Sequence, residues 1–471
     1  MPRRSGGRKS RVAIRTAPLA EELKPVRPGE SGGQYRPLTD DDTKAIVENC
    51  FRILEEVGFS QATPHCIETC TAYGAELGKD GRLRMSRDVV QNALDATPNE
   101  LTLCAQDPAQ DLTLSGSKVF FSTAGAAVMV VDPVTGEYRD STAQDLYDMA
   151  RITDTCEHIH MFQRTCVPRD ILDNCAMDIN TTYNAIMGTS KHVGASWTEA
   201  YHLQETLKLL HVAAGSEAAG QAGATAPPCL AGTISQAWAE CLGGLVYVNA
   251  IKPGAPAIVG TWPFVSDLRT GAMSGGSPEQ GILSAACAQI GQYLSLPMGT
   301  GCGMSDSKIP DFQAGSEHGY NAAVAALSGA NVIYEAAGMY ASLLGTCPES
   351  LLLDNDILGA CLRMVKGVTV NTETLAFDAL KEVCLNGPGH YLGTEQTLSV
   401  MQTEYIYPEF SNRLSPNDWK DAGRPDLLTA VITRKKEILS SHVPRHISDE
   451  VDAKIRAQFP IFLSREAMGR G

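Results

Sequence analysis

The chain has 471 residues, of which 43% are hydrophobic and 20% charged, and its formal net charge is -15. This length allows roughly two to four domains or one large α/β barrel, and the apolar fraction excludes wholesale disorder. Residues 1–16 hold six basic residues and no acidic one, so the remaining chain carries 33 basic and 54 acidic side chains, a balance of -21. So acidic a body argues against nucleic-acid binding through a broad basic surface.

Targeting and membrane signals are absent from the sequence. No apolar h-region follows the basic residues, and no run approaches 18 apolar residues, so we expect neither a secretory signal nor a membrane span. The 14 cysteines are dispersed without a CxxC pair, which is typical of small buried hydrophobes in a reducing compartment. We therefore expect a cytoplasmic protein.

The pattern along the chain divides it into four regions. Residues 1–36 are basic and then rich in Pro and Gly, which predicts a terminal segment that is disordered or draped over the surface. Residues 37–140 predict helices and a hairpin, the first helix opening at Thr39 before three acidic residues. Residues 141–400 predict a barrel core, and residues 401–471 a C-terminal helical extension.

The core shows short apolar segments that end in Gly, Ser or Thr and alternate with helical patterns. Spacings near 25–40 residues are those of βα units in a parallel sheet. With VFFSTAG and VMVVD counted as contributors, we expect an α/β fold built on a closed TIM (β/α)8 barrel, with an N-terminal mixed α/β region and C-terminal helices. The other predicted strands are residues 158–165, 191–197, 228–235, 256–262, 297–303 and 331–338.

Two glycine-rich segments have simple structural interpretations. No GxGxxG follows a strand, which disfavours a dinucleotide-binding fold. GTGCG, residues 299–303, lacks the Lys of a phosphate loop and predicts a close approach of the backbone at the barrel rim. GGSPEQ predicts a helix start with Ser277 as N-cap and Pro278 as the first helical residue.

Candidate site residues follow from the barrel rule that reacting groups lie at the C-terminal ends of strands and in the loops after them. Aromatic side chains with one or two acids suit a quaternary ammonium ion, which donates no hydrogen bond and is held by cation–π attraction. From spacing alone, simple closure of the barrel top explains the aromatics equally well. The candidates are Trp197, Trp262, Phe264 and Tyr340, with Glu335 or Asp306 as the acid.

The segment MSGGSPEQGILSAACAQIGQYLSLPMGTGCGMSDSKIPDFQAGSEHGYNAAVAALSGANVIYEAAGM resembles the trimethylamine methyltransferase family. The likeness extends from about residue 38 to the C-terminus and includes DPVTGEYRDSTAQDLYDMARITD, NGPGHYLGTEQTL and PEFSNRLSPNDWKDAG. It implies a TIM barrel and transfer of a methyl group from a methylated amine to the Co(I) corrinoid of a separate carrier protein. Since the chain contains no pyrrolysine, the implied substrate moves from trimethylamine toward a quaternary amine such as glycine betaine.

The resemblance then assigns expected roles. Glu335 would offset the cation, and Arg164, Lys308 or His390 would hold a substrate carboxylate, His390 within the family-like GPGHYLG loop. We expect no tightly bound cofactor and no metal, with cobalamin supplied by the partner. We also expect a homo-oligomer without membrane or nucleic-acid partners.

Two other functions remain open. A barrel lyase or aldolase could form a Schiff base at Lys191 or Lys308, although Lys191 begins its predicted strand and so lies at the wrong end. A non-catalytic betaine-binding protein would use the same aromatic cage without methyl transfer.

Overall fold

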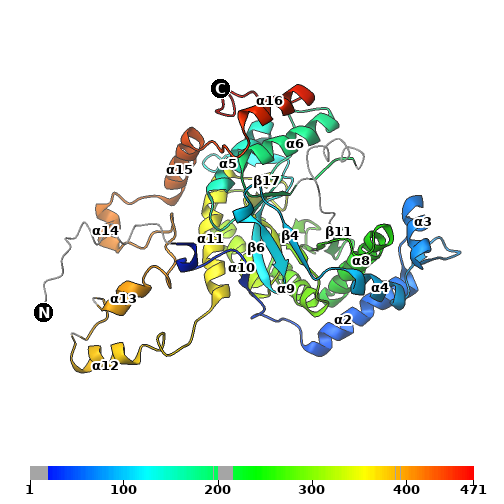
Figure 1. The fold of residues 1–471 in the computed structure, drawn as a ribbon, viewed down its shortest axis with the longest axis horizontal. Helices are drawn as coiled ribbons and strands as arrows, with labels where there is room; N and C mark the ends of the chain where they lie inside the picture. The colour runs from blue at the N-terminus through cyan, green and yellow to red at the C-terminus, as the bar shows by residue number, and fades with distance from the viewer. Residues whose placement is uncertain (1–19, 195, 200–215, 388, 393) are drawn as a thin grey trace.

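A sheet of parallel strands lies at the centre of the molecule (Figure 1). The structure, a computed structural model, describes residues 20–194, 196–199, 216–387, 389–392 and 394–471. The hydrogen-bonded order is β10-β9-β6-β15-β14-β12-β11, and every neighbouring pair along it is parallel. The strands are β6 (Lys118–Thr123), β9 (Met161–Gln163), β10 (His192–Gly194), β11 (Ser216–Ala222), β12 (Val259–Ser266), β14 (Met298–Gly301) and β15 (Val332–Ala337).

Neighbouring strands follow one another in chain order from β6 through β9 to β10, and again from β11 through β12 and β14 to β15. These two runs meet where β15, the last strand in the chain, pairs with β6, the first. No pairing among the described residues joins β10 to β11. Helices alternate with the strands and cover the sheet, which confirms a mixed α/β fold with a central parallel sheet (Figure 1). They are α5 (Ala143–Thr155), α6 (Asn174–Gly188), α8 (Leu230–Ile251), α9 (Pro278–Tyr293), α10 (Phe312–Leu327) and α11 (Pro348–Lys366).

Three strand predictions need correction. PCLAGTIS, predicted as a strand, begins helix α8, whose buried positions such as Ile234, Trp238 and Leu242 recur at helical spacing. A short apolar run does not separate strand from helix, and the pattern continues without a turn to Ile251. VMVVD forms β7 (Met129–Val131) in a separate sheet, and β11 lies in a segment to which the sequence pattern assigned no strand. The pattern EAYHLQETLKLLHVAA, which predicts a helix, lies mostly outside the described residues.

The N-terminal elements pack beside the sheet and against its N-terminal end. The Thr39 side chain accepts from the Asp42 N–H, with the reciprocal bond of a capping box, so the predicted helix start is confirmed. The β4–β5 hairpin places Leu101, Leu103, Leu112 and Leu114 against Phe120 and Val332, which begin central strands. The elements are η1 (Glu21–Leu23), β1 (Glu30–Ser31), α2 (Asp40–Arg52), the π-helical turn η2 (Ile53–Val57), α3 (Pro64–Tyr73), β2 (Glu76–Leu77), β3 (Leu83–Arg84), α4 (Arg87–Ala96), β4 (Glu100–Leu103), η3 (Pro108–Gln110) and β5 (Leu112–Ser115).

Small strands and C-terminal helices complete the fold. A four-stranded sheet has the order β16-β17-β7-β8, from β16 (Met339–Tyr340), β17 (Gly345–Thr346), β7 and β8 (Tyr138–Asp140), and β13 (Met273–Ser274) pairs with β12. The C-terminal tail packs on α5, where the Tyr147 hydroxyl donates to the Met468 carbonyl over 3.0 Å. The remaining helices are α12 (Phe377–Leu385), α13 (Glu395–Val400), α14 (Pro416–Asp421), α15 (Leu427–Ser441) and α16 (Asp449–Gln458).

Over the part of the chain that the structure describes, every helix is too short or too polar to cross a bilayer.

Candidate active site

Aromatic rings gather between the middle parts of β12 and β15. Trp262 stacks on Tyr334 with ring centroids 5.5 Å apart and an interplanar angle of 11°, and Phe264 meets Trp262 edge-on at 5.8 Å. Since β14 lies between these two strands, its side chains must leave room for the rings. A Cβ at Gly301 would lie 2.4 Å from Trp262 Cε3, and one at Gly299 would lie 2.3 Å from Tyr334 Cε2. Both inward-facing positions therefore require glycine.

A buried carboxylate lies on β15, the strand that carries Tyr334. Glu335 is 1% exposed and follows Tyr334 on β15, at a register shift between Ile333 and Ala337. Its φ of 65° is left-handed, a conformation that costs a non-glycine residue about 1–3 kcal/mol. The shift turns the Glu335 carboxylate toward β6, where Oε2 accepts a 2.8 Å hydrogen bond from the Gly125 N–H.

Gly125 and Gln163 complete this cluster. A Cβ at Gly125 would lie 2.7 Å from Glu335 Oε1 and 3.0 Å from Gln163 Oε1, so both side chains converge above this glycine. Gln163 ends β9, and Gly194 of β10 lies against its Cγ. We call Gln163, Trp262, Phe264, Tyr334 and Glu335 the aromatic–carboxylate cluster. It combines polarisable ring faces with an acid on neighbouring parallel strands, which suits an organic cation.

The opposite end of the sheet is closed by the β4–β5 hairpin. Its leucines pack with Phe120 and Val332 at the starts of the strands, and Met161, Tyr334 and Trp262 belong to the same apolar group. The cluster therefore rests on a packed apolar layer. A ligand would approach it from the loops that follow the strands.

Arg164 directly follows Gln163 of this cluster in the sequence, and Trp197 comes shortly after the neighbouring strand β10. Buried Arg164 Nε and Nη1 have no hydrogen-bond partner in the described parts of the chain, and neither has Trp197 Nε1. Burial lowers the pKa of Arg164, and the Asp178 carboxylate on α6 opposes that shift. Both side chains thus keep donors for a ligand, and so does Trp262 Nε1.

Three other predicted residues lie elsewhere. Tyr340 is 2% exposed, donates to or accepts from Ser350 Oγ at 2.6 Å and packs on His318, so α10 and α11 enclose it away from Trp262. Lys308 is exposed and its Nζ donates to the Asp306 carbonyl over 2.7 Å. His390 is exposed between α12 and α13, in a segment that stands off the sheet (Figure 1).

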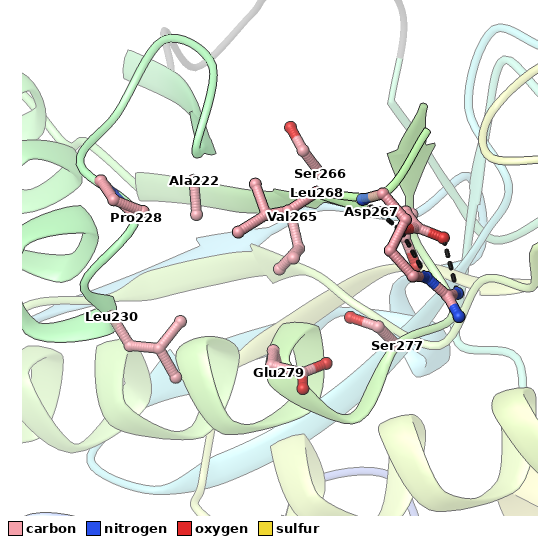
Figure 2. Close-up of a pocket in the computed structure, with 11 residues that line it drawn as sticks. Ala222, Pro228, Leu230, Val265, Ser266, Asp267, Leu268, Ser277 and Glu279 are labelled. Carbon is pink, nitrogen blue, oxygen red and sulfur yellow. Dashed lines mark hydrogen bonds and ion pairs between the residues drawn. The ribbon is translucent and has the colours of Figure 1, made fainter. Parts of the chain in front are cut away.

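A groove of about 410 Å³ opens at the end of β12. Figure 2 shows it between this strand, the start of α8 and the start of α9, with Leu268 and Val265 in its wall. Ser277 caps α9 as predicted, accepting from the Gln280 N–H, while the Gln280 side chain donates to the Gly301 carbonyl over 2.8 Å instead of reaching back. That bond fixes the backbone beneath Trp262.

Lys191, a lysine considered for Schiff-base chemistry, already donates hydrogen bonds to backbone carbonyls. Lys191 is 6% exposed, and its Nζ donates to the carbonyls of Thr153 at 2.8 Å, Ile159 at 2.5 Å and Cys156. All three ammonium hydrogens are thus used to hold the end of α5 and the loop after it. In the residues that the structure describes, no three His, Cys, Asp or Glu side chains are grouped to hold a metal.

Sequence reasoning missed Tyr334 and Gly125. The signal for Tyr334 was the alternation of glycines at 299 and 301, since an inward strand without side chains leaves space for neighbouring rings. Gly125 had no such signal, because its role depends on the bulge at Glu335 in a strand distant in sequence.

Comparison with known proteins identifies the class of protein that carries this site. A model of the family described as "Trimethylamine methyltransferase (MTTB)" matches residues 4–222 and 217–465. The chain belongs to this family and is a methyltransferase.

Three relatives show how far the likeness extends. A glycine betaine methyltransferase of Desulfitobacterium hafniense is 28% identical over 469 residues, covering 90% of this chain and 96% of the relative. A trimethylamine methyltransferase MttB of the same species is 27% identical, covering 89% and 92%. A trimethylamine methyltransferase MttB1 of Methanosarcina mazei is 28% identical, covering 91% and 95%.

Proposed function

We propose that this methyltransferase moves a methyl group from a quaternary ammonium compound such as glycine betaine to the Co(I) corrinoid of a separate carrier protein. The observation that carries the substrate class is the stack of Trp262 on Tyr334 beside buried Glu335. A quaternary ammonium ion gains about 0.5–2 kcal/mol from each suitable ring face, and a nearby carboxylate adds charge compensation. A relative named glycine betaine methyltransferase supports the same class.

The proposed reaction needs alignment more than acid–base chemistry. A quaternary nitrogen keeps the electron pair of its broken C–N bond and leaves as a neutral tertiary amine. The Co(I) corrinoid supplies the nucleophile that accepts the methyl cation equivalent. The chain's own part is to orient the N–CH3 bond, exclude water and hold the cation before transfer. Rings and one carboxylate are sufficient for this.

Arg164 is the cation that we propose for the carboxylate of a betaine. Of the three predicted cations, it alone combines burial with unpaired donors, Nε and Nη1, among the described residues. It directly follows Gln163 of the aromatic–carboxylate cluster. Lys308 and His390 are exposed and lie outside the cluster.

The exposed rim supports a macromolecular methyl acceptor. Four large apolar side chains lie in segments that follow central strands or their extensions, three of them in loops and Phe312 at the start of α10. This is the end of the sheet from which the cluster is approached. Their exposed fractions are 93% for Leu172, 71% for Leu268, 93% for Phe312 and 53% for Leu344. We define these four residues as the apolar rim. Exposed apolar side chains grouped around a site mark a docking surface for another protein.

A spectroscopic assay tests the proposed function. The protein is mixed with a corrinoid carrier protein in its Co(I) form and with glycine betaine, trimethylamine or dimethylglycine, and the cobalt absorption is followed. We expect glycine betaine to convert the Co(I) spectrum to that of the methylated corrinoid, and the neutral leaving group, dimethylglycine, to be inactive. Failure of every quaternary amine would reject the substrate class.

We also propose that the seven parallel strands of the described residues close into a β/α barrel, with β10 meeting β11. The pairing of the last strand, β15, with the first, β6, supports closure, as does chain order everywhere else in the sheet. A crystal structure that includes residues 195–215 checks this arrangement.

A further inference from the structure

Three segments meet around one carboxylate after the C-terminal ends of the central strands. Asp306, in the loop after β14, accepts a 2.7 Å hydrogen bond at Oδ1 from the Gly275 N–H and a 2.5 Å bond at Oδ2 from the Ser274 hydroxyl. Its Oδ1 also accepts from the Ser342 hydroxyl over 2.5 Å. Ser274 ends β13, Gly275 follows it, and Ser342 lies between β16 and β17. We call these four residues the carboxylate junction.

Helix α10 holds the backbone on which this junction is built. Glu317 Oε2 accepts from the Asp306 N–H over 2.8 Å and from the Ser305 hydroxyl over 2.6 Å. Gly276 lies so close to the same carboxylate that a Cβ there would be 2.3 Å from Oε2. Asn321 Nδ2 donates to the Gly276 carbonyl over 3.0 Å. The loop after β14 and the segment after β13 therefore rest on one helix, and Asp306 bonds them to each other.

The turn between β16 and β17 depends on the same loop. Residues 341–343 have φ angles of 49°, 52° and 78°, a region that residues other than glycine rarely adopt. The Ala341 N–H donates to the Ser307 carbonyl over 2.9 Å, and the Ser342 N–H donates to the Ser305 carbonyl over 3.2 Å. These backbone bonds and the Ser342 hydroxyl all end in the loop after β14, which supports the unfavourable turn.

The three segments carry three of the four residues of the apolar rim. Leu268 lies between β12 and β13, Phe312 begins α10 directly after the Asp306 loop, and Leu344 directly follows the turn. Hydrogen bonds to an ionised carboxylate are roughly twice as strong as those between neutral groups. One acid that receives three of them can therefore hold three rim residues in a fixed arrangement.

We infer that Asp306 is a positioning residue for methyl transfer, because it holds Leu268, Phe312 and Leu344 in one arrangement before the corrinoid carrier protein docks. The inference rests on the proposed function, in which the apolar rim receives the carrier. A surface that is ordered in advance loses less conformational freedom on binding. Asp306 acts through the rim, so its loss weakens docking of the carrier and leaves the amine site intact.

Hydrogen exchange of the full chain tests the junction without an assay of activity. In Asp306→Ala, the N–H groups of residue 306 and Ser342 keep their acceptors, Glu317 Oε2 and the Ser305 carbonyl. We expect both to exchange at least tenfold faster than in the wild type, because the joined segments separate, while α8 keeps its protection. Faster exchange at Gly275 alone, which loses its own acceptor, would overturn the inference.

A milder substitution keeps the test valid if Asp306→Ala does not fold. Ser342→Ala removes one bond of the junction and leaves Asp306 as the acceptor for the Gly275 N–H. We expect the Gly275 N–H to exchange at least threefold faster, although the substitution lies in another segment. An unchanged rate at Gly275 would show that the segments are not coupled through the carboxylate, against the inference.

Steady-state kinetics connect the junction to methyl transfer. For Asp306→Ala we expect the KM for the carrier protein to rise at least tenfold and the KM for glycine betaine to change less than twofold, a split that general misfolding does not produce. Asp306→Asn keeps the side-chain shape and one acceptor oxygen and should recover most of the loss. Asp132→Ala is the control, since its carboxylate accepts from the Val134 and Thr135 N–H groups of its own turn.

The possible failures are distinguishable. An unchanged carrier KM in an active Asp306→Ala protein would overturn the inference and leave the proposed function intact. A wild-type protein that methylates no corrinoid carrier would reject the proposed function, and with it the role of Asp306 in docking.

Discussion

Glu335 has a backbone conformation that few non-glycine residues adopt, and the structure holds it there with a bulge in β15 and a hydrogen bond from Gly125. Strain of this kind persists only where the surrounding structure over-determines it, and it concentrates at functional sites. The result is a carboxylate aimed at Gln163 instead of lying along the strand.

Replacement of Glu335 by Gln tests the charge of this side chain. Gln keeps an oxygen for the Gly125 N–H and removes the negative charge, so we expect the KM for the quaternary amine to rise about tenfold, equivalent to about 1.4 kcal/mol. Steady-state kinetics at saturating carrier protein measure this change. Glu279→Gln, at the groove beside β12, is the matched control and should change KM less than twofold. Equal effects of the two substitutions would contradict a role specific to Glu335.

The Trp262 ring face provides a second residue-scale test. Trp262→Leu removes the ring and should raise the KM for the amine roughly 2-fold to 30-fold, the range of one cation–π contact of about 0.5–2 kcal/mol. Trp262→Phe should recover part of the loss. Inhibition by 3,3-dimethylbutyrate, in which carbon replaces the charged nitrogen, should weaken less in Trp262→Leu. A parallel loss for glycine betaine and for this analogue with an uncharged headgroup would show that the ring acts through shape alone.

At the scale of elements, a buried ion pair joins α10, α11 and β16. His318 Nδ1 lies 3.1 Å from Asp354 Oδ1, and both residues are almost fully buried. Burial disfavours the charged imidazole, but the Asp354 carboxylate outweighs it and raises the pKa of His318 above its ordinary 6.5. Asp354 also accepts from the Gly338 N–H over 2.7 Å, which fixes the chain between β15 and β16.

The raised pKa predicts how stability depends on pH. Because the folded state binds the proton more tightly than the unfolded state, the contribution of His318 is fully present below about pH 6.5 and is lost as pH rises through its folded pKa. Urea unfolding of the wild type and His318→Gln between pH 6 and 9 measures it. We expect the difference in free energy of unfolding to shrink with rising pH. A constant difference would show that packing, not protonation, sets the cost of the substitution.

At the scale of the whole molecule, the two ends of the parallel sheet differ. The β4–β5 hairpin covers the N-terminal ends of the strands, while the apolar rim lies on the side of their C-terminal ends. We therefore expect the carrier protein to dock at the C-terminal ends.

The apolar rim should affect the carrier protein and not the amine. Phe312→Asp replaces a 93% exposed ring at the first residue of α10, where an acid suits the helix dipole. We expect the KM for the carrier protein to rise at least fivefold, with the KM for the amine unchanged. Ile251→Asp, 57% exposed at the far end of α8, is the control. If Phe312→Asp leaves the carrier KM unchanged, the rim residue takes no part in docking.

The sequence by itself determined the alternation of strands and helices, the helix starts at Thr39 and Ser277, and the membership in a methyltransferase family. These features are local or are carried by motifs, so they can be read along the chain. It also placed Trp262, Phe264 and Glu335 on or directly after central strands, but it ended the strand of Trp262 too early, since β12 continues to Ser266 and β15 to Ala337.

Only the tertiary structure decided which of these residues meet. The sequence predicts Tyr340 and Trp262 on the same face, yet a turn at residues 341–343 with three positive φ angles leads the chain from β16 into β17, and helices enclose Tyr340. Tyr334 replaces it beside Trp262 because Gly299 and Gly301 leave space between their strands. Contacts across the sheet depend on register, bulges and the size of intervening side chains, and no single segment of sequence carries that information.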